Sequence, residues 1–482
     1  MMRLTDLLPE VSRYDIEIRG LTDRADQVRP GDAFLALAGR RRHGLMFAPE
    51  AERRGAAVVL YEPGAAEVPA LTIPTVAVRR LGERVAELAS RFYGHPSREL
   101  EVIGITGTNG KTSCSFYLAQ ALDGAVVGTL GWGRWPDLKP TDYTTAPAVA
   151  TQRRLAALRD AGVATVAMEV SSHALDQGRV DQVAFDIALW TNLTRDHLDY
   201  HRTLAAYRDA KRKLFAFPGL ETAVINLDDP AWIDFYRGTG AQVWGYAWYN
   251  REPTPFPVLR AEAVRFLPDG IEFTACLDRE RAPVRAALLG EGNLANVLAV
   301  LTVLRARGLD FAEAARRLAR LRAVPGRMEC FSAPGRPRVV VDYAHTPAAL
   351  EMALRSLRRH CRGVLWLVFG CGGERDRGKR PQMGRIAERW ADRVVVTDDN
   401  PRGEDGDAIV REIVAGMHRP PRVLRDRAAA IAAAVRSAAA EDVVLVAGKG
   451  HETWQEVQGR RLPFSDRDVI VNLLELETAP CV

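Results

Sequence analysis

A short apolar segment that leads into a glycine-rich turn and then a helical stretch most limits how this chain can fold. A strand is predicted over 101–106, the turn reads GITGTNGKT over 104–112, and a helix is predicted over 112–122. Gly107 and Gly110 allow backbone N–H groups to close around an anion, and the start of the helix adds the positive end of its dipole. This arrangement predicts a phosphate-binding loop at one edge of a parallel sheet.

The turn is typical of a loop that binds a nucleoside triphosphate. The strict pattern GxxxxGK[ST] would need a glycine at position 105, where this chain has isoleucine, so the turn is a variant. The chemistry is retained, because Lys111 can reach the β- and γ-phosphates and the Thr112 hydroxyl can bind Mg²⁺. We therefore expect an ATP site that includes Gly107, Thr108, Asn109, Gly110, Lys111 and Thr112.

Strand-like and helical segments alternate along the chain, which predicts an α/β fold built on parallel sheets. Further strands are predicted over 33–38, 56–61, 75–78, 125–128, 163–170, 185–189, 222–226, 336–341, 364–369, 393–397 and 443–447. Further helices are predicted over 81–93, 151–161, 290–307 and 311–321. The length of 482 residues suits about three domains. With a Gly-His-Pro-Ser turn at 94–97, we expect domains over 1–98, 99–332 and 333–482.

The composition argues against several classes of protein. With 47% hydrophobic and 26% charged residues, the chain is an ordinary globular one, and it has no run of about 20 apolar residues. Residues 1–10 lack the pattern of a secretory signal, so we expect a cytoplasmic protein. The net charge of +5 is diffuse, which argues against nucleic acid. The six cysteines form no CxxC pair, which argues against a zinc ribbon or a disulfide framework.

Lysine is rare in this chain, which has six lysines and 60 arginines. Where only a positive charge is needed, a chain with this bias can use arginine, so its few lysines are the places to look for amine chemistry. The six are Lys111, Lys139, Lys211, Lys213, Lys379 and Lys449. We assign no such role to Lys139 and Lys213.

Two further segments place polar side chains directly after predicted strands, where parallel sheets bind their ligands. The first, MEVSSH at 168–173, offers Glu169 as a ligand for Mg²⁺. The second, TNLTRDHLDYH at 191–201, contains a group of Asp and His residues, and Tyr207 and Lys211 follow it. Both segments predict a site beside the phosphate loop.

These segments resemble the motifs of the Mur ligases, ATP-dependent enzymes that add amino acids to peptidoglycan precursors. The resemblance covers nearly the whole chain and includes TGTNGKT at 106–112, EVSSH at 169–173, DHLDYH at 196–201, GEGNLAN at 290–296, PGR at 325–327 and DYAHTP at 342–347. The segments TT at 144–145, DDNPR at 398–402 and GKGHE at 448–452 resemble members that add the third peptide residue. The resemblance implies a small N-terminal α/β domain, a central P-loop domain with a parallel sheet and a C-terminal Rossmann-like domain.

The resemblance also implies a reaction. ATP phosphorylates a carboxylate to an acyl phosphate, and an amine then displaces phosphate to form an amide. Lys111, His197 and a carbamylated Lys211 are the implied catalytic residues, and CO₂ supplies the carbamate. Two Mg²⁺ ions are implied, one held by Thr112 and Glu169 and the other by His197 and Lys211. The nucleotide would also meet Asn293, Asn296, Arg327 and Asp342.

The implied partners are UDP-MurNAc-L-Ala-D-Glu and a diamino acid, with the enzyme a monomer. The residues carried over for the UDP substrate are Asp23, Thr144, Thr145, Ser171, Gln177 and Arg179. The family's DSR motif reads TDR at 22–24 here and lacks the serine, so the contact near Asp23 departs from the family pattern. Arg40, Arg41 and Arg42 are candidates for the diphosphate.

The incoming amino acid is implied to meet residues of the third domain: Arg375, Asp399, Asn400, Pro401, Arg402, Gly448 and Glu452. The DNPR segment resembles that of enzymes adding meso-diaminopimelate. Arg375 and Arg402 can bind the carboxylate at the far end of that substrate, and Glu452 can receive the ammonium there. Gly403 and Gly406 replace residues common in the family, so the sequence leaves lysine or ornithine open as the substrate. It also leaves open a ligase like folylpolyglutamate synthase, or a nucleotide-gated binding protein without ligation.

Overall fold

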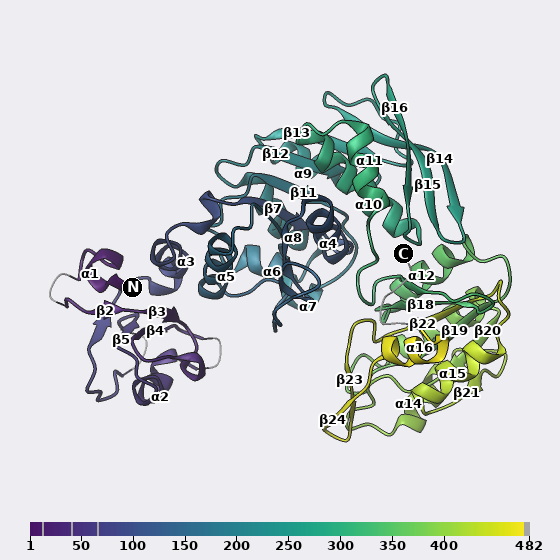
Figure 1. The fold of residues 1–482 in the computed structure, drawn as a ribbon. Coiled ribbons are helices and arrows are strands. Elements are labelled where there is room, and N and C mark those ends of the chain that lie inside the picture. The colour runs from purple at the N-terminus through teal and green to yellow at the C-terminus, as the bar shows by residue number, and fades with distance from the viewer. Residues whose placement is uncertain (12–13, 40–41, 65–66, 477–482) are drawn as a thin grey trace. The chain divides into compact units, whose positions relative to one another are not determined.

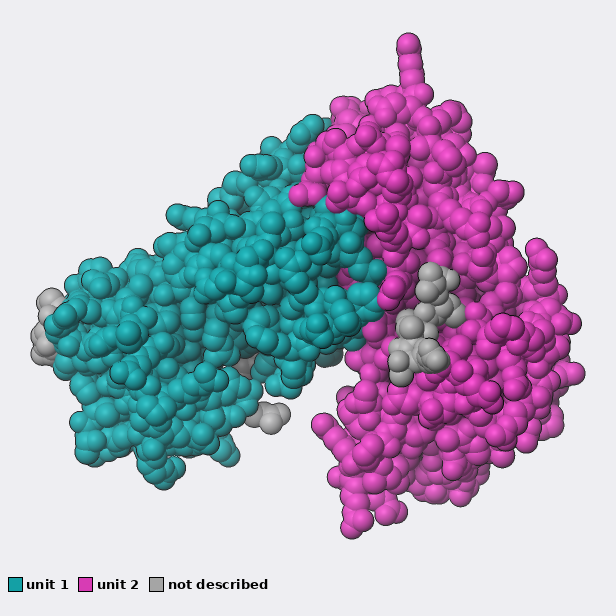
Figure 2. Space-filling model, viewed as in Figure 1, with its two compact units in different colours: residues 1–111, 118–225, 229–243 teal, residues 112–117, 226–228, 244–482 magenta. Residues whose placement is uncertain are grey.

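A computed structural model describes residues 1–482 except 12–13, 40–41, 65–66 and 477–482, and Figure 1 labels its elements. The chain forms two compact units (Figure 2). Unit 1 comprises Met1–Lys111, Leu118–Ile225 and Asp229–Val243, and unit 2 comprises Thr112–Tyr117, Asn226–Asp228 and Trp244–Val482. Among the described helices, none has the length and apolar character needed to cross a membrane.

Unit 1 begins with a four-stranded parallel sheet in the order β3-β4-β5-β6. Its strands are β3 (Gly20–Thr22), β4 (Asp32–Ala36), β5 (Val58–Tyr61) and β6 (Thr75–Ala77). Helix α3 (Leu81–Phe92) buries Leu81, Val85 and Leu88 in the core that these strands share. The smaller elements are β1 (Met2–Arg3), α1 (Leu4–Leu7), β2 (Glu17–Ile18), η1 (Ala25–Gln27), η2 (Gly44–Phe47) and α2 (Ala48–Arg53).

A second sheet in unit 1 carries the phosphate loop. Its strands run in the order β12-β11-β7-β10-β8-β9, and all but β9 are parallel. They are β7 (Glu101–Thr106), β8 (Ala125–Gly128), β9 (Gly131–Gly133), β10 (Thr165–Glu169), β11 (Ile187–Trp190) and β12 (Thr222–Asn226). Because parallel strands end at the same edge, the segments after β7, β8, β10 and β11 meet there.

Helices separate these strands, as the alternating pattern predicts. They are η3 (Pro96–Arg98), α4 (Lys111–Leu122), α5 (Ala148–Asp160), α6 (Ser172–Asp176), α7 (Leu198–His201), α8 (Leu204–Arg212), η4 (Lys213–Ala216) and α9 (Trp232–Arg237). The predicted bounds match those of β7, β8 and β12, and the predicted start of α5 lies three residues late.

The strands that lead into the long last segment of unit 2 were not predicted from the sequence. Strand β13 (Gln242–Ala247) pairs with β14 (Val258–Leu267), which forms an antiparallel sheet with β15 (Gly270–Leu277) and β16 (Glu280–Ala286). Buried and exposed residues alternate along β16, which is the two-residue period of a half-buried strand. Helices α10 (Glu291–Ala306) and α11 (Phe311–Ala319) follow, as predicted.

The rest of unit 2 is a six-stranded sheet in the order β17-β18-β22-β19-β20-β21. These strands are β17 (Glu329–Phe331), β18 (Arg338–Asp342), β19 (Leu365–Phe369), β20 (Arg393–Val396), β21 (Arg422–Val423) and β22 (Val443–Ala447). The other elements are α12 (Pro347–Arg358), α13 (Lys379–Trp390), α14 (Gly406–Val414), α15 (Arg427–Ser437), β23 (Trp454–Val457), β24 (Arg460–Pro463) and α16 (Asp466–Leu474). The strands from β18 to β21 are parallel, so the segments that follow them also share one edge.

Candidate active site

The phosphate loop has a backbone that only glycine can follow at two positions. Gly107 has a φ of +146° and Gly110 a φ of +86°. A Cβ atom at Gly107 would lie 1.9 Å from Oγ1 of Thr191. The Lys111 Nζ folds back over the loop and donates to the carbonyls of Gly107 (2.8 Å) and Thr108 (2.9 Å). The loop therefore holds an amine at the first residue of α4, as a phosphate site requires.

Residues directly after β11 hold the loop in this shape. The Thr191 hydroxyl donates to the Asn109 carbonyl at 2.6 Å. The Asn192 side chain accepts from the Asn109 N–H at 3.0 Å, and its backbone carbonyl accepts from the Thr108 N–H at 2.8 Å. Asn192 was not predicted from the sequence, although it lies at the strand end where ligand-binding residues gather.

Lys211 reaches the same carbonyl as Lys111. Its Nζ donates to the Gly107 carbonyl at 2.8 Å, and the residue is 1% exposed. Nζ also lies 4.5 Å from the centroid of the Tyr207 ring. Burial, and then the charge of Lys111, lowers the pKa of Lys211 well below its usual value, while Asp196 acts in the opposite direction. Lys211 is therefore an amine biased toward its neutral form, next to the phosphate loop.

A group of histidine and tyrosine rings lies beside α7. The ring centroids of His173 and His197 are 4.9 Å apart, and those of His173 and Tyr200 are 4.3 Å apart. A ring nitrogen of His201 lies 3.0 Å from the Ser172 hydroxyl. Burial is the main reason that the pKa values of His173 and His201 are lowered. Among the described residues, no group of three or more His, Cys, Asp or Glu side chains has the arrangement of a metal site.

Glu169 is buried at the end of β10, with its carboxylate held by the neighbouring strand β8. Oε1 accepts from the Thr129 N–H at 2.8 Å, and Oε2 accepts from the Thr129 hydroxyl at 3.1 Å. A Cβ atom at Gly128 would lie 2.1 Å from Oε1, so glycine leaves room for the carboxylate. The Thr129 hydroxyl lies 3.0 Å from that of Thr144. Thr129 was not predicted as a site residue, but it links Glu169 and Thr144, which were predicted.

The residues predicted for the UDP substrate form a hydrogen-bonded chain. The Thr145 hydroxyl donates to the Glu169 carbonyl (2.8 Å) and accepts from the Ser171 N–H (3.0 Å). Arg179 donates to the Thr145 carbonyl at 2.9 Å and to Oε1 of Gln177 at 2.6 and 2.9 Å. Burial lowers the pKa of Arg179. The structure therefore places these four predicted residues together.

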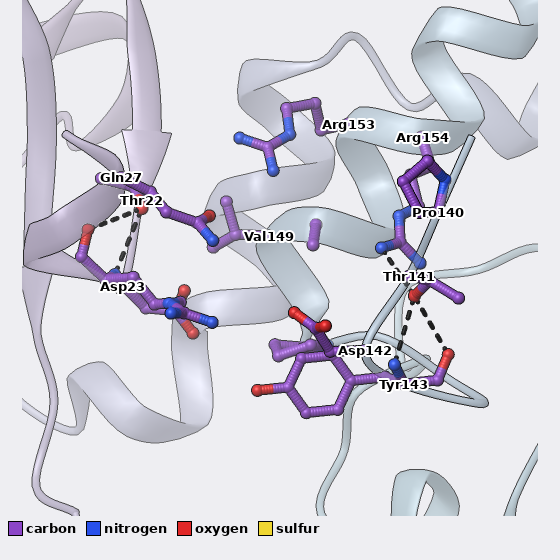
Figure 3. A pocket seen from close by; sticks show the side chains of 13 residues that line it. Thr22, Asp23, Gln27, Pro140, Thr141, Asp142, Tyr143, Val149, Arg153 and Arg154 are labelled. Carbon is purple, nitrogen blue, oxygen red and sulfur yellow. Dashed lines mark hydrogen bonds between the residues drawn. The ribbon is translucent and has the colours of Figure 1, made fainter. Parts of the chain in front are cut away.

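A pocket opens beside Asp23, the remaining residue of that set (Figure 3). It is lined by Asp23, Thr141, Asp142, Tyr143, Arg153 and Arg154, among others. Burial raises the pKa of Asp23, and Arg154 donates to the Thr141 hydroxyl at 2.9 Å. The two arginines were not predicted. Arg40 and Arg41 lie outside the described residues, and Arg42 is exposed.

In unit 2, Asn293 and Asn296 on α10 are buried and bonded to side chains of α4. The Asn293 Oδ1 accepts from the Tyr117 hydroxyl at 3.0 Å and from the Asn296 amide at 3.2 Å. Cys114 lies 3.4 Å from the Asn296 Oδ1. In this structure the two asparagines join the helix of the phosphate loop to α10.

Arg327 and Asp342 lie together at the start of the last sheet. The Asp342 carboxylate accepts from the N–H groups of Met328 (2.8 Å) and Ala344 (2.9 Å), and burial raises its pKa. The Arg327 guanidinium lies 4.4 Å from the centroid of the Tyr343 ring. This pairing presents one cation and one flat ring on a short segment of chain.

The residues predicted for the amino acid lie after β19, β20 and β22, at one edge of this sheet. Asn400 is buried and donates to Oε2 of Glu452 at 2.9 Å. Arg402 donates to the Gly373 carbonyl at 2.6 Å, and its φ of +53° is uncommon for a residue with a side chain. A Cβ atom at Gly372 would lie 3.0 Å from Nη1 of Arg402 and 3.7 Å from Cγ of Arg375. The two predicted arginines therefore flank one glycine.

Behind this edge, Asp399 and Gly448 are in close contact. A Cβ atom at Gly448, which has a φ of +118°, would lie 2.5 Å from Oδ2 of Asp399. Burial raises the pKa of Asp399. Similarly, a Cβ atom at Gly373 would lie 1.9 Å from the Pro401 carbonyl. The glycines of these segments allow the strand ends to approach.

Comparison with known families covers most of the chain. The Mur ligase family catalytic domain matches residues 17–93, the Mur ligase middle domain residues 105–304, and the Mur ligase glutamate ligase domain residues 326–450.

The chain belongs to the Mur ligase family.

Similar proteins match this chain over nearly their full lengths. A relative from Alkalilimnicola ehrlichii, named UDP-N-acetylmuramoyl-L-alanyl-D-glutamate–2,6-diaminopimelate ligase, is 49% identical over 98% of this chain and 99% of its own. A solved structure with the same enzyme name has 32% identity and a TM-score of 0.72, covering 98% of this chain and 99% of the other. A MurF ligase from Thermotoga maritima, solved with ADP, has a TM-score of 0.65 at 21% identity over 96% and 98% of the chains, which shows the fold. The Mur ligase assignment makes this chain an ATP-dependent ligase.

The α/β class and the resemblance to Mur ligases, both expected from the sequence, are confirmed. The structure brings Lys111 and Lys211 to one carbonyl and groups the segments after β19, β20 and β22. It also shows hydrogen-bonded supports to which the sequence assigned no role: Thr129 after β8, Asn192 after β11, Lys449 after β22 and Glu456 on β23.

Proposed function

We propose that this Mur ligase joins meso-2,6-diaminopimelate to the D-glutamate carboxylate of UDP-MurNAc-L-Ala-D-Glu, with conversion of ATP to ADP and phosphate, in peptidoglycan precursor synthesis. The observation that carries this proposal is the 49% identity, over nearly the full length of both chains, to a relative named for that reaction. The arginines Arg375 and Arg402 support it, since they flank Gly372 at the strand ends and can each bind a carboxylate.

The reaction needs an activated carboxylate, because a carboxylate does not react with an amine at a useful rate. A carboxylate oxygen attacks the γ-phosphorus and ADP leaves, which gives an acyl phosphate. The neutral amine then attacks the acyl carbon, loses a proton, and the tetrahedral intermediate expels phosphate. Lys111 and the N–H groups of the phosphate loop act on the charge of the transferred phosphoryl group.

We assign the carbamate of the Mur ligases to Lys211. Carbamylation joins a neutral amine to CO₂ with loss of a proton, and it turns a cation into an anion. The lowered pKa of Lys211 supplies the neutral amine, and arginine has no equivalent chemistry. Lys211 is 1% exposed and lies beside the phosphate loop, which is consistent with a group that acts at that site.

Two Mg²⁺ ions belong to this proposal. Thr112 and Glu169 would hold one, and His197 and the Lys211 carbamate would hold the other. The donors fit the ion, because hydroxyl and carboxylate oxygens are ligands that Mg²⁺ prefers. The ions would neutralise charge on the phosphates. Glu169 is already oriented for such a role by its two hydrogen bonds to Thr129.

The remaining site residues keep the roles that the family resemblance implies. Asn293, Asn296, Arg327 and Asp342 would bind the nucleotide. The UDP substrate would meet Asp23, Thr144, Thr145, Ser171, Gln177 and Arg179, and the amino acid would meet Arg375, Asp399, Asn400, Pro401, Arg402, Gly448 and Glu452. We also propose domain bounds of 1–98, 99–332 and 333–482, a monomer, and a cytoplasmic location, where ATP and UDP-linked precursors are found.

A product assay tests the function. The purified protein is incubated with ATP, Mg²⁺ and UDP-MurNAc-L-Ala-D-Glu, together with meso-diaminopimelate, L-lysine or L-ornithine, and products are identified by mass spectrometry. We expect ADP and a tripeptide product, with diaminopimelate the best substrate. ATP consumption without a lengthened peptide would overturn the proposal, and products only from folate and glutamate would favour a folylpolyglutamate synthase-like ligase.

A further inference from the structure

Five residues near one edge of the last sheet form one polar network around Asn400, which Glu456 joins through its backbone N–H. We call Asn400, Arg402, Lys449, Glu452 and Glu456 the Asn400 network. The Lys449 Nζ donates to Oδ1 of Asn400 (3.0 Å) and to Oε2 of Glu452 (2.9 Å). The Glu456 N–H donates to the same Oδ1 at 3.0 Å. The Asn400 amide nitrogen donates to Glu452, so its oxygen and nitrogen each face a suitable partner.

The network contains two ion pairs, so its charges cancel. Lys449 pairs with Glu452, and Nε of Arg402 lies 3.3 Å from Oε2 of Glu456. The Lys449 side chain is fully buried, whereas that of Glu452 is 20% exposed. Burial acts to raise the pKa of Glu452, but the hydrogen bond and charge of Lys449 oppose it, and the pKa lies below its usual value. Glu452 is thus an anion whose charge is already compensated inside the protein.

The family resemblance assigns substrate contacts to Arg402 and Glu452 but leaves Lys449 and Glu456 without a role. Lys449 carries the charge opposite to that of Glu452, and Glu456 carries the charge opposite to that of Arg402. A role in folding alone would not require this pairing with the two assigned residues. The pairing instead matches the chemistry of the far end of the substrate. That end carries one ammonium and one carboxylate in diaminopimelate, but an ammonium alone in lysine and ornithine.

We propose that Lys449 and Glu456 determine the choice of diamino acid, because they keep the Asn400 network electrically neutral. A neutral network with separated charges accepts an end group that is itself neutral overall. A purely cationic end group adds an uncompensated charge and leaves Arg402 without a carboxylate to bind, so it is disfavoured. This inference rests on the proposed ligation of a diamino acid.

The two residues should act in opposite directions, which distinguishes selection by charge from a structural role. Lys449→Met gives the network a net negative charge, which should raise kcat/KM for lysine relative to diaminopimelate by about tenfold. Glu456→Gln gives it a net positive charge, which should lower the same ratio by a similar factor of about ten. Lys449→Arg keeps the charge but places a larger group in the same space, so it should lower both kcat/KM values and leave their ratio at the wild-type level.

Arg460→Met is the matched control. Arg460 is an exposed cation on β24 and pairs in register with Val457, so it lies on the opposite face of the hairpin from Glu456. Its loss removes a positive charge from this hairpin on the face away from the side chain of Glu456. We expect both kcat/KM values to stay at the wild-type level.

The measurement is kcat/KM for meso-diaminopimelate and for L-lysine, followed through ADP release and checked by mass of the product. The inference is overturned if Lys449→Met and Glu456→Gln lower both values by the same factor, or shift the ratio in the same direction. Glu456 is partly exposed on a hairpin, so its variant tests the inference even if Lys449→Met does not fold. A wild-type protein that makes no product with either amino acid would instead overturn the proposed function.

Discussion

Two lysines in this chain are almost completely buried, and their surroundings are opposite. Lys211 is 1% exposed, and the charge that most affects it after burial is that of another lysine, Lys111. Lys449 is 0% exposed and lies 2.9 Å from the carboxylate of Glu452. The first environment drives an amine toward its neutral form, and the second supports a fixed cation. The same residue type therefore serves as a reactive group in unit 1 and as a counter-ion in unit 2.

The contrast explains how a chain with 60 arginines can need lysine for two different reasons. At position 211 the requirement is chemical, because a guanidinium cannot be neutral at physiological pH or take up CO₂. At position 449 the requirement is one of space. A single compact nitrogen fits between Asn400 and Glu452, whereas a guanidinium is larger and planar. Exchanging lysine for arginine at each position separates these two reasons.

The largest effect is expected from Lys211→Arg. It keeps a cation where the proposal requires a carbamate, so the rate of ADP release in the full reaction should fall by about a hundred- to a thousandfold. Lys213→Arg, two residues further along, is the matched control, because Lys213 is an exposed cation paired with Asp176. Its rate should stay within about twofold of wild type. Near-normal ligation by Lys211→Arg would remove the distinction between the two lysines.

A smaller effect, with opposite signs at the two sites, is expected on stability in CO₂-free buffer. The unfolded chain protonates Lys211 up to its usual pKa of 10.5, while the folded chain does not, so the buried amine costs stability at neutral pH. Lys211→Met should therefore stabilise unit 1, and the gain should shrink as the pH rises toward 10.5.

Lys449→Met should instead destabilise unit 2 at neutral pH. It leaves Glu452 without its counter-ion, at a cost of about 2 kcal/mol, which is below the ~3–5 kcal/mol of a fully buried pair because Glu452 is partly exposed. The pKa of Glu452 is lowered in the folded protein, so this loss should be complete above its usual value of 4.5 and disappear on acidification through the folded pKa. Calorimetry of both variants from acidic pH to about pH 10.5 measures the change in stability. Changes of the same sign for the two variants at neutral pH would contradict the comparison.

The fold could be predicted in most places where one residue pattern decides it. The buried apolar strands β7 and β22 were placed correctly, because each is short, apolar and bounded by turn residues. Strands β14 to β16 were missed, since arginine and glutamate alternate there with apolar residues and their partners are set by hairpin pairing. Their two-residue period was nevertheless present in the sequence.

The site residues also divide into those that a local sequence pattern predicts and those that it does not. Lys111 and the phosphate-loop glycines could be predicted because their contacts lie within one turn of the chain. The scarcity of lysine indicated Lys211 as a candidate for amine chemistry, but its role could be predicted only through the family motif, since its partner Gly107 lies 104 positions away. The contact of Asn400 with Lys449 depends on the order of β20 and β22 in the sheet, and that of Arg402 with Glu456 depends on where β23 lies. No local pattern reports either arrangement.

The smallest effect concerns the aromatic ring near each lysine. Nζ of Lys211 lies 4.5 Å from the Tyr207 ring centroid, and Nζ of Lys449 lies 5.6 Å from that of Trp454. By distance alone, the Tyr207 ring should stabilise its lysine more than the Trp454 ring does. A ring face attracts a cation much more strongly than a neutral amine, however, so we expect a double-mutant cycle of Trp454→Leu with Lys449→Met to give a coupling of about 0.5–1 kcal/mol. The cycle of Tyr207→Leu with Lys211→Met in CO₂-free buffer should give a coupling close to zero. A larger coupling at Tyr207 than at Trp454 would mean that Lys211 is charged in the folded protein, and the amine would then be unavailable to CO₂.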